Sequence, residues 1–151
     1  MEEQQQEEIL TRLVAGLVTA GPLDWHRGAH ALVSLAVVSP DIAVAMLDGV
    51  AQNSNSFVRM YAAWAATKIG STDVLEALAA DSSPNVRTLA VQGLFGLKGH
   101  GADGVLVAQL DQDDPQLLLT VAELLEGTAN REEAVGPLVA ALLRVSKEQR
   151  E

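Results

Sequence analysis

The 151-residue sequence predicts an all-α protein, a solenoid of about four helical hairpins preceded by one further helix. Two observations predict this fold. A polar segment followed by an amphipathic helix recurs at intervals near thirty residues, and the apolar content is mainly Ala, Leu and Val, with only five aromatic residues. Such side chains suit close packing of helix on helix. A recurrent unit of this length is typical of repeat architectures, in which neighbouring units bury one another.

The repeat is clearest in the two segments that begin at residues 53 and 81. Each contains a polar cluster, then Val-Arg, then Ala three positions after the arginine. The valines are Val58 and Val86, and the arginines, Arg59 and Arg87, are 28 residues apart. Because the apolar residues that follow are spaced by three and four, each segment is predicted to open a helix with one buried face.

Weaker copies extend the pattern on both sides. Residues 113–119 repeat the polar cluster and the proline with Leu118 in the arginine position, and residues 23–29 form a degenerate copy with Trp25 in the valine position. These alignments divide the chain into a capping helix, four repeats and a polar tail. The predicted boundaries are 1–22 for the cap, 23–52, 53–80, 81–110 and 111–146 for the repeats, and 147–151 for the tail.

Each repeat is predicted to contain two helices separated by glycine or proline. The first helices begin at polar caps, which we place at Asp24, Ser54 or Ser56, Ser83 and Asp114, and end near Pro40, Gly70, Gly99 and Gly127. The second helices are expected at 41–51, 73–80, 103–110 and 132–145, each opening with an acidic residue as the helix dipole favours, and the N-terminal helix at 6–20. The acidic N-terminus and the polar C-terminal tail suit the ends of such a stack.

The order of Asp or Pro, Val-Arg, Ala at plus three, a glycine-stopped helix and a second Leu/Ala helix resembles the HEAT repeat. It is closest to the short HEAT-like units of bacteria and of phycobilin lyase subunits, and the resemblance covers roughly residues 23–144. It implies a right-handed superhelix whose second helices line the concave face. It also implies that Arg59 and Arg87 pair with polar residues of neighbouring turns, for which Asp81 and Asp113 are candidates. The fourth repeat lacks that arginine, so the series is expected to end there.

Composition narrows the classes of function. The formal net charge of −10 disfavours nucleic acid and anionic membranes, which need clustered Lys and Arg, and favours a basic partner, unless the charge serves only solubility. The absence of cysteine excludes disulfides, thiolate catalysis and Cys-ligated zinc. The N-terminus is acidic and rich in glutamine, unlike a signal peptide, and no apolar run is long enough to span a membrane. We therefore expect a cytoplasmic location.

No motif predicts catalysis, a cofactor or a metal site. His26 and His30 are four residues apart on a predicted helix, a spacing that two metal ligands use. The metalloprotease glutamate is missing, however, and a partly exposed helix surface is the preferred explanation. His100 lies in a glycine-rich turn, residues 99–104, that is interpreted as a loop and lacks a phosphate-loop ending. We therefore expect that the protein is not an enzyme.

Phe57, Tyr61 and Trp64 share one face of a predicted first helix, where the other repeats place mostly polar residues. One interpretation is a surface for a partner or for self-association, since aromatic residues dominate interface hot spots. The other is that uneven stacking covers the rings locally. Shifting the first repeat by one residue would set Trp25 opposite Phe57.

The second helices are expected to line an acidic concave groove. Convergent carboxylates attract cationic partners, although a merely solvated face is the alternative. The residues assigned to this groove are Asp48, Gln52, Asp73, Glu76, Asp103, Gln109 and Glu133.

The leading functional hypothesis is a non-enzymatic scaffold or adaptor that binds another protein through the acidic groove, the aromatic residues or both. A second hypothesis, which rests on the family resemblance alone, is an accessory subunit of a bilin lyase or isomerase. A third is an acidic decoy or regulator of a nucleic-acid-binding protein. Direct binding of nucleic acid or membrane is not expected.

Overall fold

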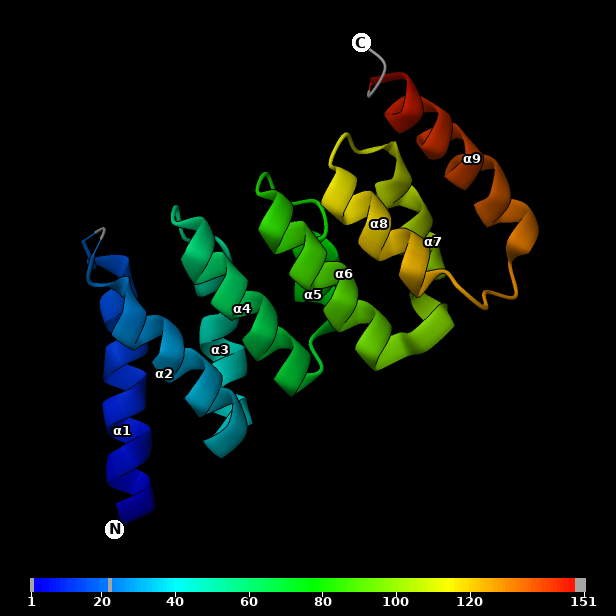
Figure 1. Cartoon of the computed structure of the whole chain (residues 1–151). Helices are drawn as coiled ribbons and strands as arrows, with labels where there is room; N and C mark the ends of the chain where they lie inside the picture. Colours follow the sequence, from blue (N-terminus) through cyan, green and yellow to red (C-terminus); the bar gives the residue numbers. More distant parts are fainter. Residues whose placement is uncertain (1, 22, 149–151) are drawn as a thin grey trace.

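The computed structural model of the chain describes residues 2–21 and 23–148. Within these ranges every regular element is a helix and no strand occurs, which confirms the predicted all-α fold (Figure 1). No helix in this part of the chain is both long and apolar enough to cross a membrane. The elements, with 3-10 helices written as η, are α1 (Glu2–Ala15), η1 (Gly16–Val18), α2 (Trp25–Val38), α3 (Pro40–Ala51), α4 (Ser56–Ile69), α5 (Thr72–Leu78), α6 (Pro84–Lys98), η2 (Gly99–Ala102), α7 (Asp103–Ala108), η3 (Gln109–Asp111), α8 (Pro115–Leu124) and α9 (Arg131–Glu148).

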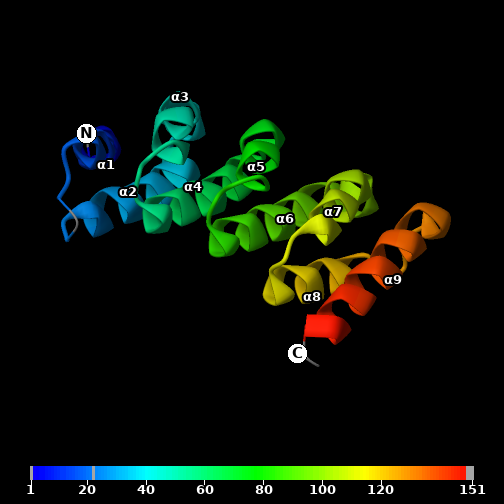
Figure 2. The ribbon, with the colours of Figure 1, turned by 90° about the horizontal axis from the view of Figure 1, so that it is seen from above.

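The helices α2, α4, α6 and α8 lie side by side in one row, each in contact with the next (Figures 1 and 2). The pairs α2–α3, α4–α5, α6–α7 and α8–α9 are also in contact, so the row is built from consecutive helical hairpins. At one end α1 packs against α2 and α3, and α9 lies at the opposite end (Figure 1). The result is an elongated molecule whose hairpins contact mainly their neighbours in sequence.

Two helices differ most from the expected bounds, while α5 and α9 differ by one to three residues at their ends. The N-terminal helix runs over Glu2–Ala15 rather than 6–20, because acidic residues suit its first turn and Gly16 opens a 3-10 turn. The expected helix 103–110 divides into α7 and η3. Residues 99–102, which were interpreted as a loop, form η2.

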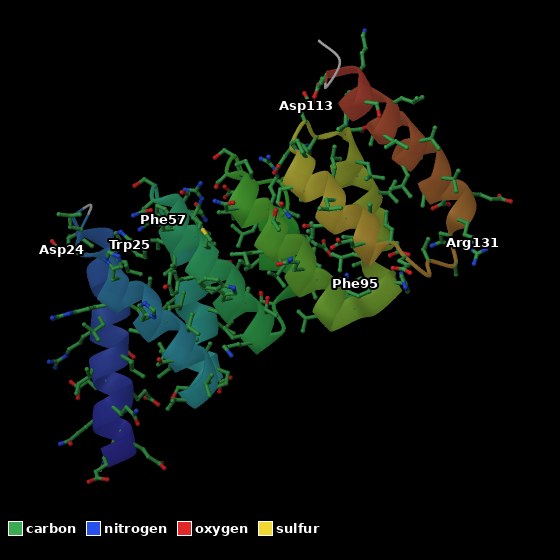
Figure 3. All side chains as sticks on the ribbon, viewed as in Figure 1. Asp24, Trp25, Phe57, Phe95, Asp113 and Arg131 are labelled. Carbon is green, nitrogen blue, oxygen red and sulfur yellow. The ribbon has the colours of Figure 1, made fainter. Side chains whose placement is uncertain are left out.

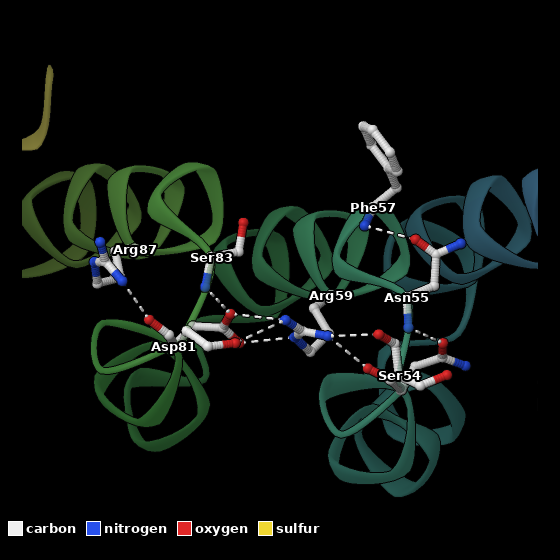
Figure 4. Close-up of polar contacts among 9 residues, drawn as sticks. Ser54, Asn55, Phe57, Arg59, Asp81, Ser83 and Arg87 are labelled. Carbon is white, nitrogen blue, oxygen red and sulfur yellow. Dashed lines mark hydrogen bonds and ion pairs between the residues drawn. The ribbon is translucent and has the colours of Figure 1, made fainter. Parts of the chain in front are cut away.

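The two ends of α4 show how local chemistry fixes a first helix. Gly70 follows the helix with a φ of 83°, a left-handed conformation that glycine adopts readily, and its N–H donates to the Ala66 oxygen at 2.9 Å. At the start, Asn55 Oδ1 accepts a hydrogen bond from the Phe57 N–H at 2.9 Å (Figure 4). The cap is therefore Asn55, and the expectation of Ser54 or Ser56 was wrong by one position.

Buried aliphatic side chains fill the space between the helices of the row. Val58 of α4 and Val86 of α6 occupy equivalent positions and are both fully buried, and Leu94 of α6 is buried as well. Small residues allow the helices to approach closely: a Cβ atom at Gly93 would overlap the side chain of Thr67 on α4. Glycine is required there by packing rather than by backbone conformation.

Arg59 joins two successive turns. Its guanidinium forms a bidentate pair with Asp81, with 2.8 Å from Nε to Oδ2 and 2.9 Å from Nη2 to Oδ1 (Figure 4). Its Nη1 donates to the backbone oxygen of Asn53 at 2.8 Å. Burial alone would raise the pKa of Asp81, but hydrogen bonds from Arg59 and from the Ser83 N–H, with the nearby arginine charges, hold that pKa below its usual value. The hydrogen bond to Asp81 correspondingly raises the pKa of Arg59.

Arg87 takes the equivalent place one repeat later. Its Nη1 donates to the backbone oxygen of Asp81 at 2.7 Å, which lies six residues earlier in the chain, the same separation as Arg59 has from Asn53. The acidic neighbour of Arg87 is Asp114, 3.9 Å away between Nη2 and Oδ2.

The family resemblance had suggested Asp113 as the acid of this later turn, and that expectation is wrong. Asp114 is the N-cap residue of α8, where its Oδ1 accepts from the Gln116 N–H at 3.1 Å and its side chain reaches α6. Asp113 is exposed and instead lies 3.2 Å from Nε of Arg144 on α9. The position of the cap selects which aspartate faces Arg87.

Arg144 continues the series that was expected to end at Leu118. The carbonyl six residues before Leu118 belongs to Gln112, and Arg144 Nη2 donates to it at 3.0 Å and to the Leu110 oxygen at 2.7 Å. Leu118 itself is buried. Arg144 of α9 therefore donates to the turn carbonyls of the fourth repeat, in which Leu118 takes the position that Arg59 and Arg87 hold in the earlier repeats.

The polar tail expected at the C-terminal end of the row is described only in part. Of the predicted tail, residues 149–151 lie outside the described part of the chain, and residues 147 and 148 belong to α9. The outward face of α9 carries exposed aliphatic residues: Val135, Val139, Leu142 and Leu143.

Replacing Val86 with Asp should unfold the row, because an unpaired carboxylate would lie between α6 and its neighbours. The expected loss exceeds about 4 kcal/mol in the free energy of unfolding. Urea unfolding followed by circular dichroism measures it. Gln92→Asp, on the exposed side of the same helix, should change the stability by less than about 0.5 kcal/mol. Equal effects of the two substitutions would contradict the packing described above.

The Arg59–Asp81 pair should make stability depend on pH. The unfolded carboxyl has a pKa near 3.8 and the folded one a lower pKa, so below about pH 4.5 the unfolded state gains a proton that the folded state does not. Stability is therefore present above the unfolded pKa and is lost as the pH falls through the folded pKa. Asp81→Asn should cost about 2 kcal/mol near neutral pH, since Arg59 loses its counter-ion, and less near pH 3.

Urea midpoints at three pH values test this dependence, with Asp111→Asn as the control because Asp111 is exposed. The control should follow the wild type at every pH. If Asp81→Asn lowered the free energy of unfolding by the same amount at neutral and acidic pH, the ion pair would not be the cause of the loss.

Candidate protein-binding surfaces

Rings from α2 and α4 form what we call the aromatic surface, defined by Trp25, Phe57, Tyr61 and Trp64. Trp25 stacks on Phe57 with ring centroids 5.6 Å apart and an interplanar angle of 7°, and the two lie together at the same end of neighbouring helices (Figure 3). Tyr61 packs edge-on against Trp25 and Trp64, with centroid distances of 6.0 and 4.8 Å. Offset and edge-to-face pairs are the favourable arrangements, so each ring holds the next in place.

The aromatic surface remains accessible. The side chains of Phe57 and Trp64 are 55% and 40% exposed, whereas Trp25 and Tyr61 are half-buried beneath them. Stacking therefore partly covers Trp25 and Tyr61 and leaves Phe57 and Trp64 in contact with solvent. Trp25 lies against Phe57, as the alignment shifted by one residue had suggested.

A hollow of about 400 Å³ borders the aromatic surface between α2 and α4. Its wall includes His30, Val33, Tyr61, Trp64 and Lys68. The His30 Nε2 and Tyr61 hydroxyl atoms are 3.1 Å apart, which fixes the tyrosine at the edge of the hollow. Exposed rings beside a concavity of this size can receive side chains of another protein.

The two histidines of α2 engage different neighbours. His26 stacks on Trp25 at 3.8 Å between ring centroids, with its Nδ1 3.3 Å from the Leu23 oxygen, while His30 contacts Tyr61. Among residues 2–21 and 23–148, no group of three or more His, Cys, Asp or Glu side chains is arranged to hold a metal ion. Each histidine therefore contacts a different ring of the aromatic surface.

Part of the expected acidic groove exists between α3 and α5. Asp48 of α3, Gln52 directly after that helix and Asp73 of α5 line a hollow of about 330 Å³. Asp81 also lines it, but Arg59 balances its charge. We use the term acidic groove for this hollow.

The remaining residues assigned to the groove lie elsewhere. Glu76 is exposed on α5 and pairs with Lys98 of α6 at 3.0 Å. Asp103 and Gln109 are buried, so the expectation that they line a binding groove was wrong. Glu133 is exposed on α9, at the end of the row. The acidic side chains thus converge over α3 and α5 and do not continue along every second helix.

Asp103 is buried because it holds two segments together. Its carboxylate lies 3.1 and 3.2 Å from Nδ1 of His100 and accepts a hydrogen bond from Thr128 Oγ1. The ring of Phe95 packs edge-on against His100, with 5.4 Å between ring centroids. Thr128 lies 25 residues further along the chain, so no local pattern could indicate this contact.

The Asp103 cluster does not have the arrangement of a catalytic triad. In a triad the histidine lies between the carboxylate and the hydroxyl, from which it takes a proton. Here the carboxylate itself lies between His100 and Thr128. The cluster therefore ties η2 and α7 to the connection between α8 and α9.

Comparison of the chain with models of known families, with curated proteins and with solved structures finds no match.

Proposed function

We propose that this chain is a HEAT-like α-solenoid that acts as a non-enzymatic scaffold and binds a partner protein at the aromatic surface. In this proposal the hairpins form a right-handed superhelix with the second helices on its concave side. Contacts between successive hairpins support it, as do the matching positions of Arg59 and Arg87 six residues after a turn carbonyl. Neighbour-only contacts are typical of solenoids, which commonly present binding surfaces.

The observation that carries the functional proposal is the exposure of Phe57 and Trp64 on a rigid support. A large exposed aromatic group favours association because its burial removes apolar area from water. Trp25 and Tyr61 already hold the two rings, so binding costs little additional side-chain entropy.

Charge favours a basic partner. The formal net charge of the chain is −10, and the acidic groove gathers exposed Asp48 and Asp73 on the side of α3 and α5. Such a potential attracts a cationic protein over distances beyond direct contact and raises its association rate.

Replacing Phe57 and Trp64 together with Ser should weaken partner binding at least tenfold, because hot-spot aromatics are worth about 2 kcal/mol or more. Stability should fall by about 1–3 kcal/mol, less than for Val86→Asp, because both side chains are partly exposed but lose their contacts with Trp25 and Tyr61. Proteins retained by the immobilised wild-type chain from its native host would be identified and purified. Their affinities for wild type and variant would then be measured by calorimetry.

Leu119 and Leu97 provide a matched control, because they are 55% and 40% exposed, the same values as Phe57 and Trp64. The double variant Leu97→Ser and Leu119→Ser should bind the partner as the wild type does. A large loss of stability in the aromatic variant would place the rings in the core. Equal binding by both double variants would exclude the aromatic surface as the site.

Neutralising the acidic groove tests the role of charge separately. Asp48→Asn with Asp73→Asn should slow association of a basic partner several-fold at low salt, leave dissociation nearly unchanged and lose its effect at high salt. Stopped-flow association rates at two salt concentrations measure this. A change confined to the dissociation rate would indicate direct contact with the groove instead of long-range attraction.

A further inference from the structure

The last helix has two apolar faces, of which the fold uses one. Ala134 and Ala141 are buried against the preceding helices. The opposite face carries Val135, Val139, Leu142 and Leu143, all exposed. Their spacings of four, three and one place these side chains on a single stripe.

This aliphatic stripe contrasts with the other end of the row. The exposed residues of α1 are mainly Glu and Gln, with two aliphatic side chains, Ile9 and Leu13, among them. Contiguous aliphatic side chains on one exposed face mark an association site in water-soluble proteins. Hairpins of this type bury such flanks by stacking, which identifies another helix as the natural cover.

We infer that α9 of a second copy of this chain covers the stripe, in an antiparallel arrangement. A two-fold axis between Val139 and Ala140 places Glu132 of each copy opposite Lys147 of the other. Both residues are exposed and lie at the edges of the stripe. A parallel arrangement would instead bring Glu132 beside Glu132, and Lys147 beside Lys147.

Side-chain size also fits this register. The same axis sets Gly136 of one copy opposite Leu143 of the other. Gly136 faces open space, since a Cβ added there would meet no atom within 4 Å. The leucine of the second copy can therefore approach the backbone of α9 closely.

The interface would be small. An 18-residue helix is about 27 Å long, so a single antiparallel pair lies at the low end of specific interfaces, and a micromolar dissociation constant is expected. Each chain is acidic overall, so the dimer should be measured near physiological ionic strength, where repulsion beyond about 8 Å is screened.

Charge reversal provides the decisive experiment, with the full chain in analytical ultracentrifugation. Glu132→Lys and Lys147→Glu, each alone, should raise the dimer dissociation constant about tenfold or more, because like charges meet at both ends of the helix pair. An equimolar mixture of the two variants should dimerise as well as the wild type, because each pair of opposed residues is then oppositely charged.

Val139→Glu, with Val44→Glu on α3 as its control, tests the apolar stripe. The two valines are 49% and 50% exposed. Only Val139→Glu should abolish the dimer while retaining the helical circular dichroism spectrum. A wild-type chain that is monomeric at about 200 μM, where a micromolar complex would be mostly assembled, would overturn the inference. So would a mixture of the charge variants that stays monomeric.

The inference is independent of the proposed function. The variant with Ser at positions 57 and 64 should dimerise normally, because the aromatic surface lies on α2 and α4. Loss of the dimer in that variant would assign self-association to the aromatic surface and refute the α9 interface.

Discussion

Each hairpin of this protein has apolar side chains on two flanks, and the burial of both flanks is the constraint on which the rest of the structure depends. Val58 and Val86 satisfy it in the middle of the row, where α4 and α6 each have a neighbour on both sides. Burial of apolar area is the main stabilising contribution in such a stack. A terminal helix has a neighbour on one side only, so it can bury apolar side chains on only one flank. The acidic surface of α1 and the aliphatic surface of α9 are two different outcomes at the two ends.

Stacking in register also leaves backbone oxygens at every turn that need donors. A guanidinium group meets this need because it offers five N–H donors in one plane, enough to join a carbonyl and a carboxylate at once. Arg59 does so from within its own repeat, whereas Arg87 donates to the Asp81 carbonyl and has the Asp114 carboxylate 3.9 Å away, without a hydrogen bond to it. At the Gln112 turn the donor is Arg144 of α9, so the requirement persists where the repeat motif does not. At these three turns a backbone carbonyl accepts a hydrogen bond from an arginine, but the arginine does not always come from the same position of the repeat.

Most helices could be predicted because their causes are local, although the bounds of the N-terminal helix and the cap of α4 were not. The spacing of Val58 and Ala62, or the left-handed glycine at residue 70, depends on residues within one turn. The alignment of Phe57, Tyr61 and Trp64 on one face is local in the same sense. The acidic groove was predicted less well, because the burial of Asp103 depends on Thr128, 25 residues away. The choice between Asp113 and Asp114 depends on a cap position that differs by one residue.

The positions of the aromatic surface and the aliphatic stripe bear on how a dimer would bind a partner. The aromatic surface lies on α2 and α4, and the aliphatic stripe on α9 is at the far end of the row. Two copies joined through α9 would therefore leave both aromatic surfaces free. The distance between the two aromatic surfaces would be set by packed helices and not by a flexible linker. A partner with two matching sites would therefore bind the second site without a further loss of translational and rotational entropy. Weak affinity at one aromatic surface would then be sufficient for firm attachment of such a partner, whereas a partner with a single site would gain nothing from the dimer.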